Sequence, residues 1–394
     1  MNTALARFTL TVVCVISVPL HATTQAKPSP PQPTKLVVAT TGRPEPVLIA
    51  FVYRDAVTES AWTRSHELAR KAVDTEFGAR VHTITVERVA TAADSLSVFR
   101  DLAARGYKVI FATDPVHSDA AAKAAAADYY MKIEQAMGTQ ELINMRVYSI
   151  RHFEQAYLAG IIAAGNSATA KLGFVAASAT PAAMAEVNAF TLGAQSVNKR
   201  ATTLVTWTGS RSNSAADADA AESLINRGAD VLIATTDTTA AADVAERRGK
   251  RIIGWHADQS ARAPRAHVAT VALDWTPFYK TAIKESFDYL CTKSDTSRGY
   301  REAAIKVVGL SKSLSNTARA RLERVQSELA RGEFQVFVGP IMGGSGVGTN
   351  DVVLADKIVG DESWRKSMKF LVRGVTAIAA PQHKVPAVAR ADRR

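Results

Sequence analysis

Cysteine is almost absent from this sequence, and so are the motifs of common catalytic sites. Cys14 lies in an N-terminal apolar segment, so removal of that segment would leave Cys291 without an intramolecular partner. No His-Glu-x-x-His, Cys-x-x-Cys or Gly-x-Ser-x-Gly motif is present, and the glycine-rich stretch 342–351 lacks the Lys and Ser/Thr of a phosphate-binding loop. We therefore expect no disulfide, no metal, no cofactor and no catalytic residues, and a fold stabilised by its hydrophobic core.

Long apolar runs are also rare, and the most prominent one lies at the N-terminus. It extends from Phe8 to Leu20, which is too short to span a bilayer. Arg7 precedes it, and small and polar residues with a small-x-small site ending at Ala26 follow it, although cleavage after Ala22 fits as well. This pattern predicts a secretory signal peptide over 1–26. No Leu-x-x-Cys signal for lipid attachment ends the run, so we expect a periplasmic protein.

Concentrated charge of one sign is missing from the sequence. The formal net charge is +11 and becomes about +10 without the leader, but the charges are spread along the chain. The one local excess of positive charge is "RADRR" at the C-terminus, within a basic tail predicted over 377–394. A solvated basic surface is therefore favoured, and we expect no nucleic-acid partner.

Val- and Ile-rich runs alternate with helical patterns after a proline-rich linker over 27–45. Repeated strand–helix–strand units of this kind predict a parallel sheet. The expected strands lie within 46–53, 81–89, 108–113, 143–150, 171–177, 202–207, 231–235, 251–256 and 267–273.

These strands are more numerous than one doubly wound sheet usually contains, so we expect two lobes. The first would comprise 46–150 and 271–300. The second would comprise 151–270 and 301–376, together with the hinge. A ligand crevice is expected beyond the carboxyl ends of the strands.

Aromatic and acidic side chains gather just after the predicted strands. Four of the five tryptophans lie at such positions, where rings can stack on a planar ligand and carboxylates can accept from hydroxyl groups. The candidate ligand-binding residues are Asp55, Trp62, Thr63, Asp114, His117, Trp207, Asp237, Trp255, His256, Asp258 and Trp275.

Simpler explanations exist for individual members of this set. A tryptophan at a strand end can serve packing alone, and Trp255 can brace its own loop. Asp237 precedes a predicted helix and fits an N-cap. If His256 lines the site, ligand affinity should change near its reference pKa of about 6.5.

Eight ordered blocks between residues 46 and 341 together resemble the basic membrane protein (BMP) family of ABC transporter substrate-binding proteins, which includes the purine nucleoside receptors. They include 49–78, "EQAYLAGIIAA", "NAFTLGAQSVN", "AAESLINRGADVLIATTD" and "IIGWHADQSARAP". The resemblance implies a type I periplasmic binding fold, in which two doubly wound α/β lobes close on a ligand. It also implies capture of a purine nucleoside or related nucleobase-like molecule for an ABC permease of the inner membrane, by a monomer. Trp62 lies in the region whose aromatic residue stacks on the base in this family, and Asp258 matches the Asp that takes the sugar hydroxyls.

Several positions depart from the family pattern within the expected pocket. "ATTD" stands where close relatives often carry "QHQD", and His256 stands where Asn is common. The alternatives to a transport receptor are an exported nucleoside hydrolase that uses the carboxylates as acid and base, and a sensor that presents its ligand to a receptor. A DNA-binding regulator is disfavoured because a leader and a linker occupy the place of a helix-turn-helix motif.

Overall fold

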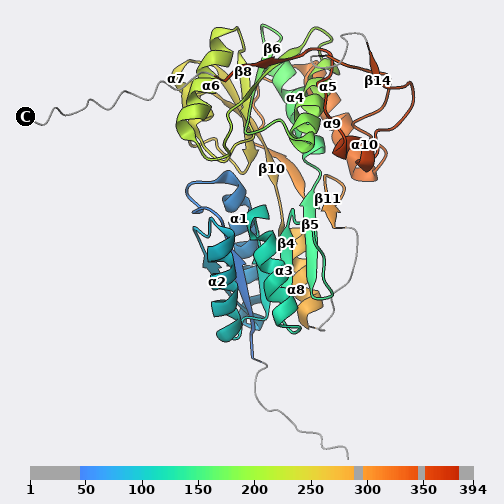
Figure 1. Ribbon diagram of the computed structural model, residues 1–394. Helices are drawn as coiled ribbons and strands as arrows, with labels where there is room; N and C mark the ends of the chain where they lie inside the picture. Colours follow the sequence, from blue (N-terminus) through green and yellow to red (C-terminus); the bar gives the residue numbers. More distant parts are fainter. Residues whose placement is uncertain (1–44, 288–295, 345–350, 381–394) are drawn as a thin grey trace, which may run out of the picture. The chain divides into compact units, whose positions relative to one another are not determined.

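The computed structural model of the protein describes residues 45–287, 296–344 and 351–380 (Figure 1). Residues from Glu45 onward form one compact unit. The predicted signal peptide, nearly all of the linker, Cys291, much of the glycine-rich stretch and the tail from residue 381 lie outside the described residues. Among the described helices, none combines the length and the apolar composition needed to cross a bilayer.

The first sheet has six strands in the order β11-β5-β4-β3-β1-β2, and all of its pairings are parallel. Strand β1, which lies between β3 and the edge strand β2, is completely buried from Ile49 to Val52. The strands are β1 (Val47–Val52), β2 (Val81–Val86), β3 (Val109–Ala112), β4 (Lys132–Ala136), β5 (Met145–Ile150) and β11 (Ser297–Arg298). The helices that connect or cover them are α1 (Ala61–Phe77), α2 (Ala92–Ala104), α3 (Ser118–Ala127) and α8 (Thr276–Phe287), with short 3-10 turns at Gly78–Arg80 and Pro115–His117.

The second sheet has seven strands in the order β12-β10-β9-β8-β6-β7-β15. Only the pair of β10 and β12 is antiparallel among its pairings. The strands are β6 (Lys171–Ala176), β7 (Thr202–Trp207), β8 (Val231–Ala234), β9 (Arg251–His256), β10 (His267–Leu273), β12 (Ile305–Val308) and β15 (Val375–Ile378). The helices of this part are α4 (His152–Asn166), α5 (Pro181–Gln195), α6 (Ser214–Asn226), α7 (Ala240–Arg247), α9 (Asn316–Arg331) and α10 (Glu362–Lys366).

A small third sheet pairs β13 (Ile341–Met342) with β14 (Val352–Leu354). In the apolar segment 334–341, which precedes the glycine-rich stretch, a strand begins only at Ile341. The predicted lobe boundaries at 151 and 271 stay a prediction, whereas the strands themselves divide between the sheets as given above. Each of the nine expected strand segments contains a strand.

Two glycines let α4 and α5 pack closely. A Cβ atom at Gly160 would lie 1.9 Å from the carbonyl oxygen of Phe190, and one at Gly193 would lie 2.1 Å from the carbonyl oxygen of Tyr157. Both distances are far inside van der Waals contact, so neither position has room for a side chain. The two helices pack against the second sheet, and the close contact with α4 fixes the position of α5. Helix α5 carries Glu186, which is described with the site below.

Strand β4 was not predicted, because its polar residues break the apolar pattern. Glu134 is completely buried and pairs with Arg146 of β5, from Nε to Oε2 and from Nη2 to Oε1, both at 2.8 Å. Such a bidentate pair satisfies a carboxylate that the sheet interior could not otherwise hold. A charged residue in a buried strand is thus explained by a partner on the neighbouring strand, which local sequence does not reveal.

Candidate functional site

Five charged side chains of alternating sign form a chain across the carboxyl ends of the two sheets. Arg54 and Asp55 follow β1, and Asp114 follows β3 of the first sheet. Arg211 and Asp237 follow β7 and β8 of the second sheet. We refer to these five residues as the charge chain.

Asp237 lies at the centre of the charge chain. Its Oδ2 atom is 3.3 Å from Nη1 of Arg54 and 3.1 Å from Nε of Arg211, and Nη2 of Arg211 donates to Oδ1 at 3.3 Å. The backbone N–H of Asp237 also donates to the carbonyl of Arg211 at 2.7 Å. The contacts at the two ends of the charge chain are longer, since Arg54 Nε is 3.7 Å from Asp55 Oδ2 and Arg211 Nη1 is 3.7 Å from Asp114 Oδ2. The chain therefore links residues of both sheets through carboxylate–guanidinium contacts.

Burial alters the charge states around this chain. It raises the pKa of Asp55 and of Asp237, while the neighbouring arginines act in the opposite direction. Burial likewise raises the pKa of Glu186 on α5 to about 7, and Arg211 is close enough to oppose that effect. The Arg211 side chain keeps 38% of its surface exposed, so it is the most accessible cation of the group. The site can thus offer both hydrogen-bond donors and acceptors to a polar solute.

A cluster of rings lies beside the charge chain and is centred on Trp62 of α1. Its indole Nε1 donates to the carbonyl of Thr113 at 2.8 Å, and only 4% of the residue is exposed. The ring centroids of His66, His256 and His152 lie 4.7, 5.2 and 6.0 Å from that of Trp62. We refer to Trp62 and these three histidines as the imidazole–indole cluster.

Burial keeps the three imidazoles neutral. It lowers the pKa of His66 and His256 well below the usual range and that of His152 to about 4. His66 Nδ1 is 2.5 Å from the hydroxyl of Tyr279, whereas His66 Nε2 and His256 Nδ1 are buried without a partner among the described residues. His256 also has a φ of 65°, which is unusual for a residue other than glycine and indicates local backbone strain.

The structure distributes the predicted site residues between these two groups and the core. Asp55, Asp114 and Asp237 belong to the charge chain, and Trp62 and His256 belong to the imidazole–indole cluster. Trp255 and Trp275 are 2% and 0% exposed and pack in the main core, with the Trp275 ring stacked on His66 at 4.7 Å. Thr63 is buried at the start of α1, where its backbone N–H donates to Ser60 Oγ.

The other three predicted residues belong to neither group, although the backbone N–H of His117 donates to the carbonyl of Asp114 at 3.1 Å. His117 is completely buried, and its Nδ1 is 2.8 Å from Ser95 Oγ. Trp207 is half-buried at the end of β7. Asp258 is exposed, and its carboxylate accepts from the backbone N–H and the hydroxyl of Ser260 at 2.9 and 3.0 Å.

The N-cap interpretation of Asp237 is wrong. Helix α7 begins after Thr239 without a side-chain cap, and the carboxylate of Asp237 faces Arg54 and Arg211 instead. Sequence reasoning also missed both arginines and Glu186, because the search at strand ends was for rings and carboxylates. The sequence does indicate both arginines by their positions, because Arg54 directly follows the predicted first strand and Arg211 lies in the loop after 202–207.

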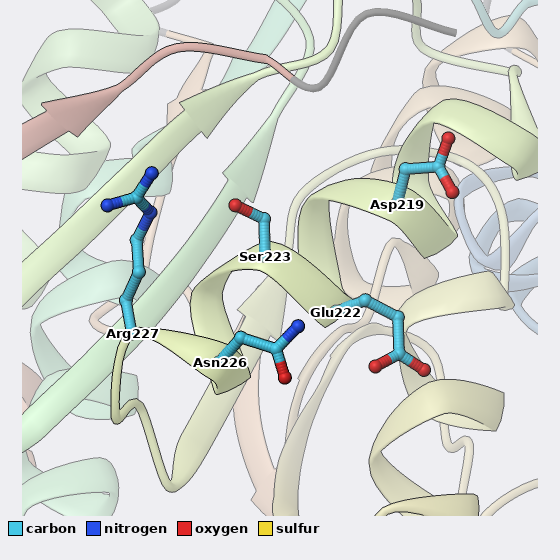
Figure 2. A pocket seen from close by; sticks show the side chains of 5 residues that line it. All are labelled: Asp219, Glu222, Ser223, Asn226 and Arg227. Atoms are coloured by element: carbon cyan, nitrogen blue, oxygen red, sulfur yellow. The ribbon is translucent and has the colours of Figure 1, made fainter. Parts of the chain in front are cut away.

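A separate surface hollow of about 490 Å³ lies on α6 (Figure 2). Asp219, Glu222, Ser223, Asn226 and Arg227 line it on successive turns of the helix. Helix α6 starts near the carboxyl end of β7 and runs back along the sheet, so its last residues lie toward the opposite edge. Ligands of open parallel sheets bind at the carboxyl edge, which favours the charge chain over this hollow as the functional site.

No group of three or more His, Cys, Asp or Glu residues in the described ranges is arranged to hold a metal ion. The three histidines around Trp62 contact it as rings and are not grouped about a common point. The arrangement can hold a solute through charge, hydrogen bonds and shape.

Comparison with known proteins identifies the family and the fold. A family model described as "ABC transporter substrate-binding protein PnrA-like" matches residues 47–336. A purine-binding protein of Brucella abortus is 31% identical over 297 residues, which cover 75% of this chain and 85% of the relative. Solved solute-binding proteins of ABC transporter systems from Conexibacter woesei and Aeropyrum pernix superpose with TM-scores of 0.64 and 0.61 at 18% and 19% identity. They cover 73% and 76% of this chain, and the match spans 98% and 93% of their own lengths.

These structures confirm the predicted type I periplasmic binding fold, and the family model confirms the predicted family. Proteins of this family are substrate-binding components that act outside the cytoplasm, where each takes up a small-molecule ligand for an ABC permease. The chain belongs to the PnrA-like family of ABC transporter substrate-binding proteins.

Proposed function

We propose that the protein captures a purine nucleoside or a related nucleobase-like molecule in the periplasm and delivers it to an inner-membrane ABC permease. The charge chain is the observation that carries this proposal, because it combines donors and acceptors from both sheets at the edge where ligands of such sheets bind. The purine-binding relative supports the ligand class. Cleavage of the predicted signal peptide and a monomeric state are parts of the same proposal.

The proposed contact residues are those of the charge chain, together with Trp207 and Asp258 from the sequence prediction. Nucleosides present hydroxyl groups that carboxylates accept from and base edges that arginines and carboxylates pair with. Trp62, Thr63, His117, Trp255 and Trp275 are buried, and we assign them to packing that holds the site rigid. We therefore expect these residues to hold the charged residues in position without contacting the ligand.

We further propose that the protein binds its ligand without converting it. Every carboxylate of the charge chain lies within 4 Å of an arginine, an arrangement suited to holding a polar solute. A general acid would instead need a proton held ready beside a scissile bond.

Calorimetry tests the proposal directly. The mature protein is titrated with nucleosides, nucleobases and simple sugars, after mass spectrometry has identified any small molecule that copurifies with it. We expect the strongest binding from a nucleoside or a nucleobase. Absence of binding by every nucleoside and nucleobase at millimolar concentration contradicts the proposed ligand class. Chromatography of a bound nucleoside after long incubation tests conversion, and recovery of free base and sugar would indicate a hydrolase.

A further inference from the structure

Nη1 of Arg211 and Oδ2 of Asp114 place a hydrogen-bond donor beside an acceptor, and apart from their mutual ion pair neither atom has a hydrogen-bond partner among the described residues. Nε and Nη2 of Arg211 are engaged by Asp237, but Nη1 is hydrogen-bonded to none of the described residues. Oδ1 of Asp114 accepts from the backbone N–H of Val116 at 3.0 Å, whereas Oδ2 is buried without a hydrogen-bond partner in the described part of the chain. Nη1 and Oδ2 lie 3.7 Å apart, which is too long for a hydrogen bond.

A buried carboxylate oxygen without a donor is unfavourable, and its position is explained if a ligand supplies the donor. Asp114 is only 3% exposed, so its carboxylate is fixed in place. Arg211 covers it from the second sheet and is far more exposed. A short movement of the Arg211 side chain would admit a ligand edge to both atoms at once.

We propose that the ligand presents a lactam edge, a carbonyl beside a ring N–H, with the N–H donating to Asp114 Oδ2 and the carbonyl accepting from Arg211. Oxopurines carry this edge, and so the inference names the class of base within the proposed function on which it rests. In this proposal Arg211 and Asp114 determine specificity in addition to binding.

Arg54 adds the preference for an oxo group over an amino group. Both guanidinium groups contact Oδ2 of Asp237, so a ligand oxygen that replaces this carboxylate oxygen between them would face two cations. A carbonyl oxygen has two lone pairs and can accept from both, whereas the ring nitrogen of an aminopurine accepts one hydrogen bond in its plane. An exocyclic amine also brings donor hydrogens toward the two guanidinium groups. Guanidinium groups accordingly pair with the oxo edge of guanine, while amide side chains pair with adenine.

Three nucleosides that differ at one edge test this inference by calorimetry on the mature protein. Inosine carries the lactam edge, 1-methylinosine lacks its N–H, and adenosine replaces the oxo group by an amine. We expect inosine to bind about 5- to 150-fold more tightly than either of the others, the range measured for loss of a base-specific pair. Equal affinities for inosine and 1-methylinosine would overturn the role of Asp114, and equal affinities for inosine and adenosine would overturn the preference for an oxo group.

Substitutions test whether Asp114 and Arg211 cause these preferences. Asp114→Asn should remove most of the difference between inosine and 1-methylinosine, and Arg211→Gln should weaken inosine more than adenosine. Arg265→Gln is the matched control, because Arg265 also pairs with a carboxylate, Glu246, but is exposed and lies outside the charge chain. Retention of the wild-type preferences by both site variants would overturn the assignment.

The outcomes separate this inference from the proposed function. If nucleosides bind without regard to the lactam edge, the proposed function stands and the inference fails. If none of the three nucleosides or their free bases binds, the proposed function fails as well. The comparison among the three ligands uses the wild-type protein, so it remains decisive even where a variant does not fold.

Discussion

Replacement of His117 by Gln should remove a defined part of the acid sensitivity of this protein. His117 is completely buried between α2 and the turn that carries Asp114, with Ser95 as its hydrogen-bond partner and Nε2 without one among the described residues. Burial lowers the pKa of His117 to about 4. The unfolded chain takes up a proton near the reference pKa of about 6.5, so unfolding is favoured as the pH falls between these values.

The size of the effect follows from the two pKa values. The stabilisation by a neutral buried His117 is fully present above pH 6.5 and is lost as the pH falls toward 4. With one pKa unit equal to about 1.4 kcal/mol, the loss from this residue amounts to ~2 kcal/mol at pH 5 and ~3 kcal/mol at pH 4. Gln can retain a hydrogen bond to Ser95 but cannot be protonated, so the variant should lack this loss.

Urea unfolding of wild type and His117→Gln at pH 7, 6, 5 and 4 measures the difference. We expect the stability gap between them at pH 7 to shift by about 2 kcal/mol in favour of the variant at pH 5. His82→Gln, at an exposed histidine, is the matched control and should leave the pH profile unchanged. Parallel profiles for wild type and His117→Gln between pH 7 and pH 4 would refute the reasoning.

Four further outcomes are expected. Asp237→Asn should weaken nucleoside binding by about 10-fold or more in calorimetry, because the carboxylate that holds both arginines is lost. Affinity should fall by about 2- to 5-fold from pH 6 to pH 8 as deprotonated Glu186 competes for Arg211, and Glu186→Gln should abolish this change. The step near pH 6.5 predicted for His256 is not expected, because burial lowers the pKa of His256 well below that value, so a step that survives in Glu186→Gln would contradict the assignment to Glu186. Gly193→Ala should destabilise the protein by about 2 kcal/mol or more in urea unfolding, because its Cβ would meet backbone of α4. Arg146→Met should cost about 3–5 kcal/mol by the same assay, since it removes the bidentate partner of the buried Glu134 and leaves only the longer contact of 3.8 Å with Lys132, and a cost below 1 kcal/mol would contradict that pairing.

The sheets could be predicted from sequence because their strands are buried on both faces and read as runs of Val and Ile. The same reasoning could not find β4, whose Glu134 becomes tolerable only when Arg146 pairs with it from β5. The antiparallel β12 carries Lys306 between its apolar residues, so its local pattern is weak. Pairing between strands distant in sequence decides these cases, and local pattern does not encode it.

The position of the site at the strand ends could also be predicted, because parallel strands deliver the residues that follow them to one edge. The sequence could not predict which of these side chains face a ligand. Trp62 and Trp275 follow strands as Asp114 does, and Trp255 lies near the end of β9, yet all three are buried in the core, where burial of a large ring is more favourable than exposure. The arginines were overlooked for the opposite reason. A lone Arg after a strand indicates solvent exposure, and only the opposing carboxylates of the other sheet show that Arg54 and Arg211 belong to a site.

The two groups of residues at this edge have different physical requirements. The imidazole–indole cluster is neutral and, apart from the half-buried His152, buried, so a rearrangement of its rings would open voids and cost packing energy. The charge chain is held by contacts of 3.1 to 3.7 Å that several geometries satisfy, and a polar ligand can replace them one for one. Ligand exchange should therefore act on the arginines and carboxylates while the rings stay fixed. A neutral solute with paired donors and acceptors suits such a site better than a phosphorylated one, because an added anion would face the three carboxylates of the chain as well as its two arginines.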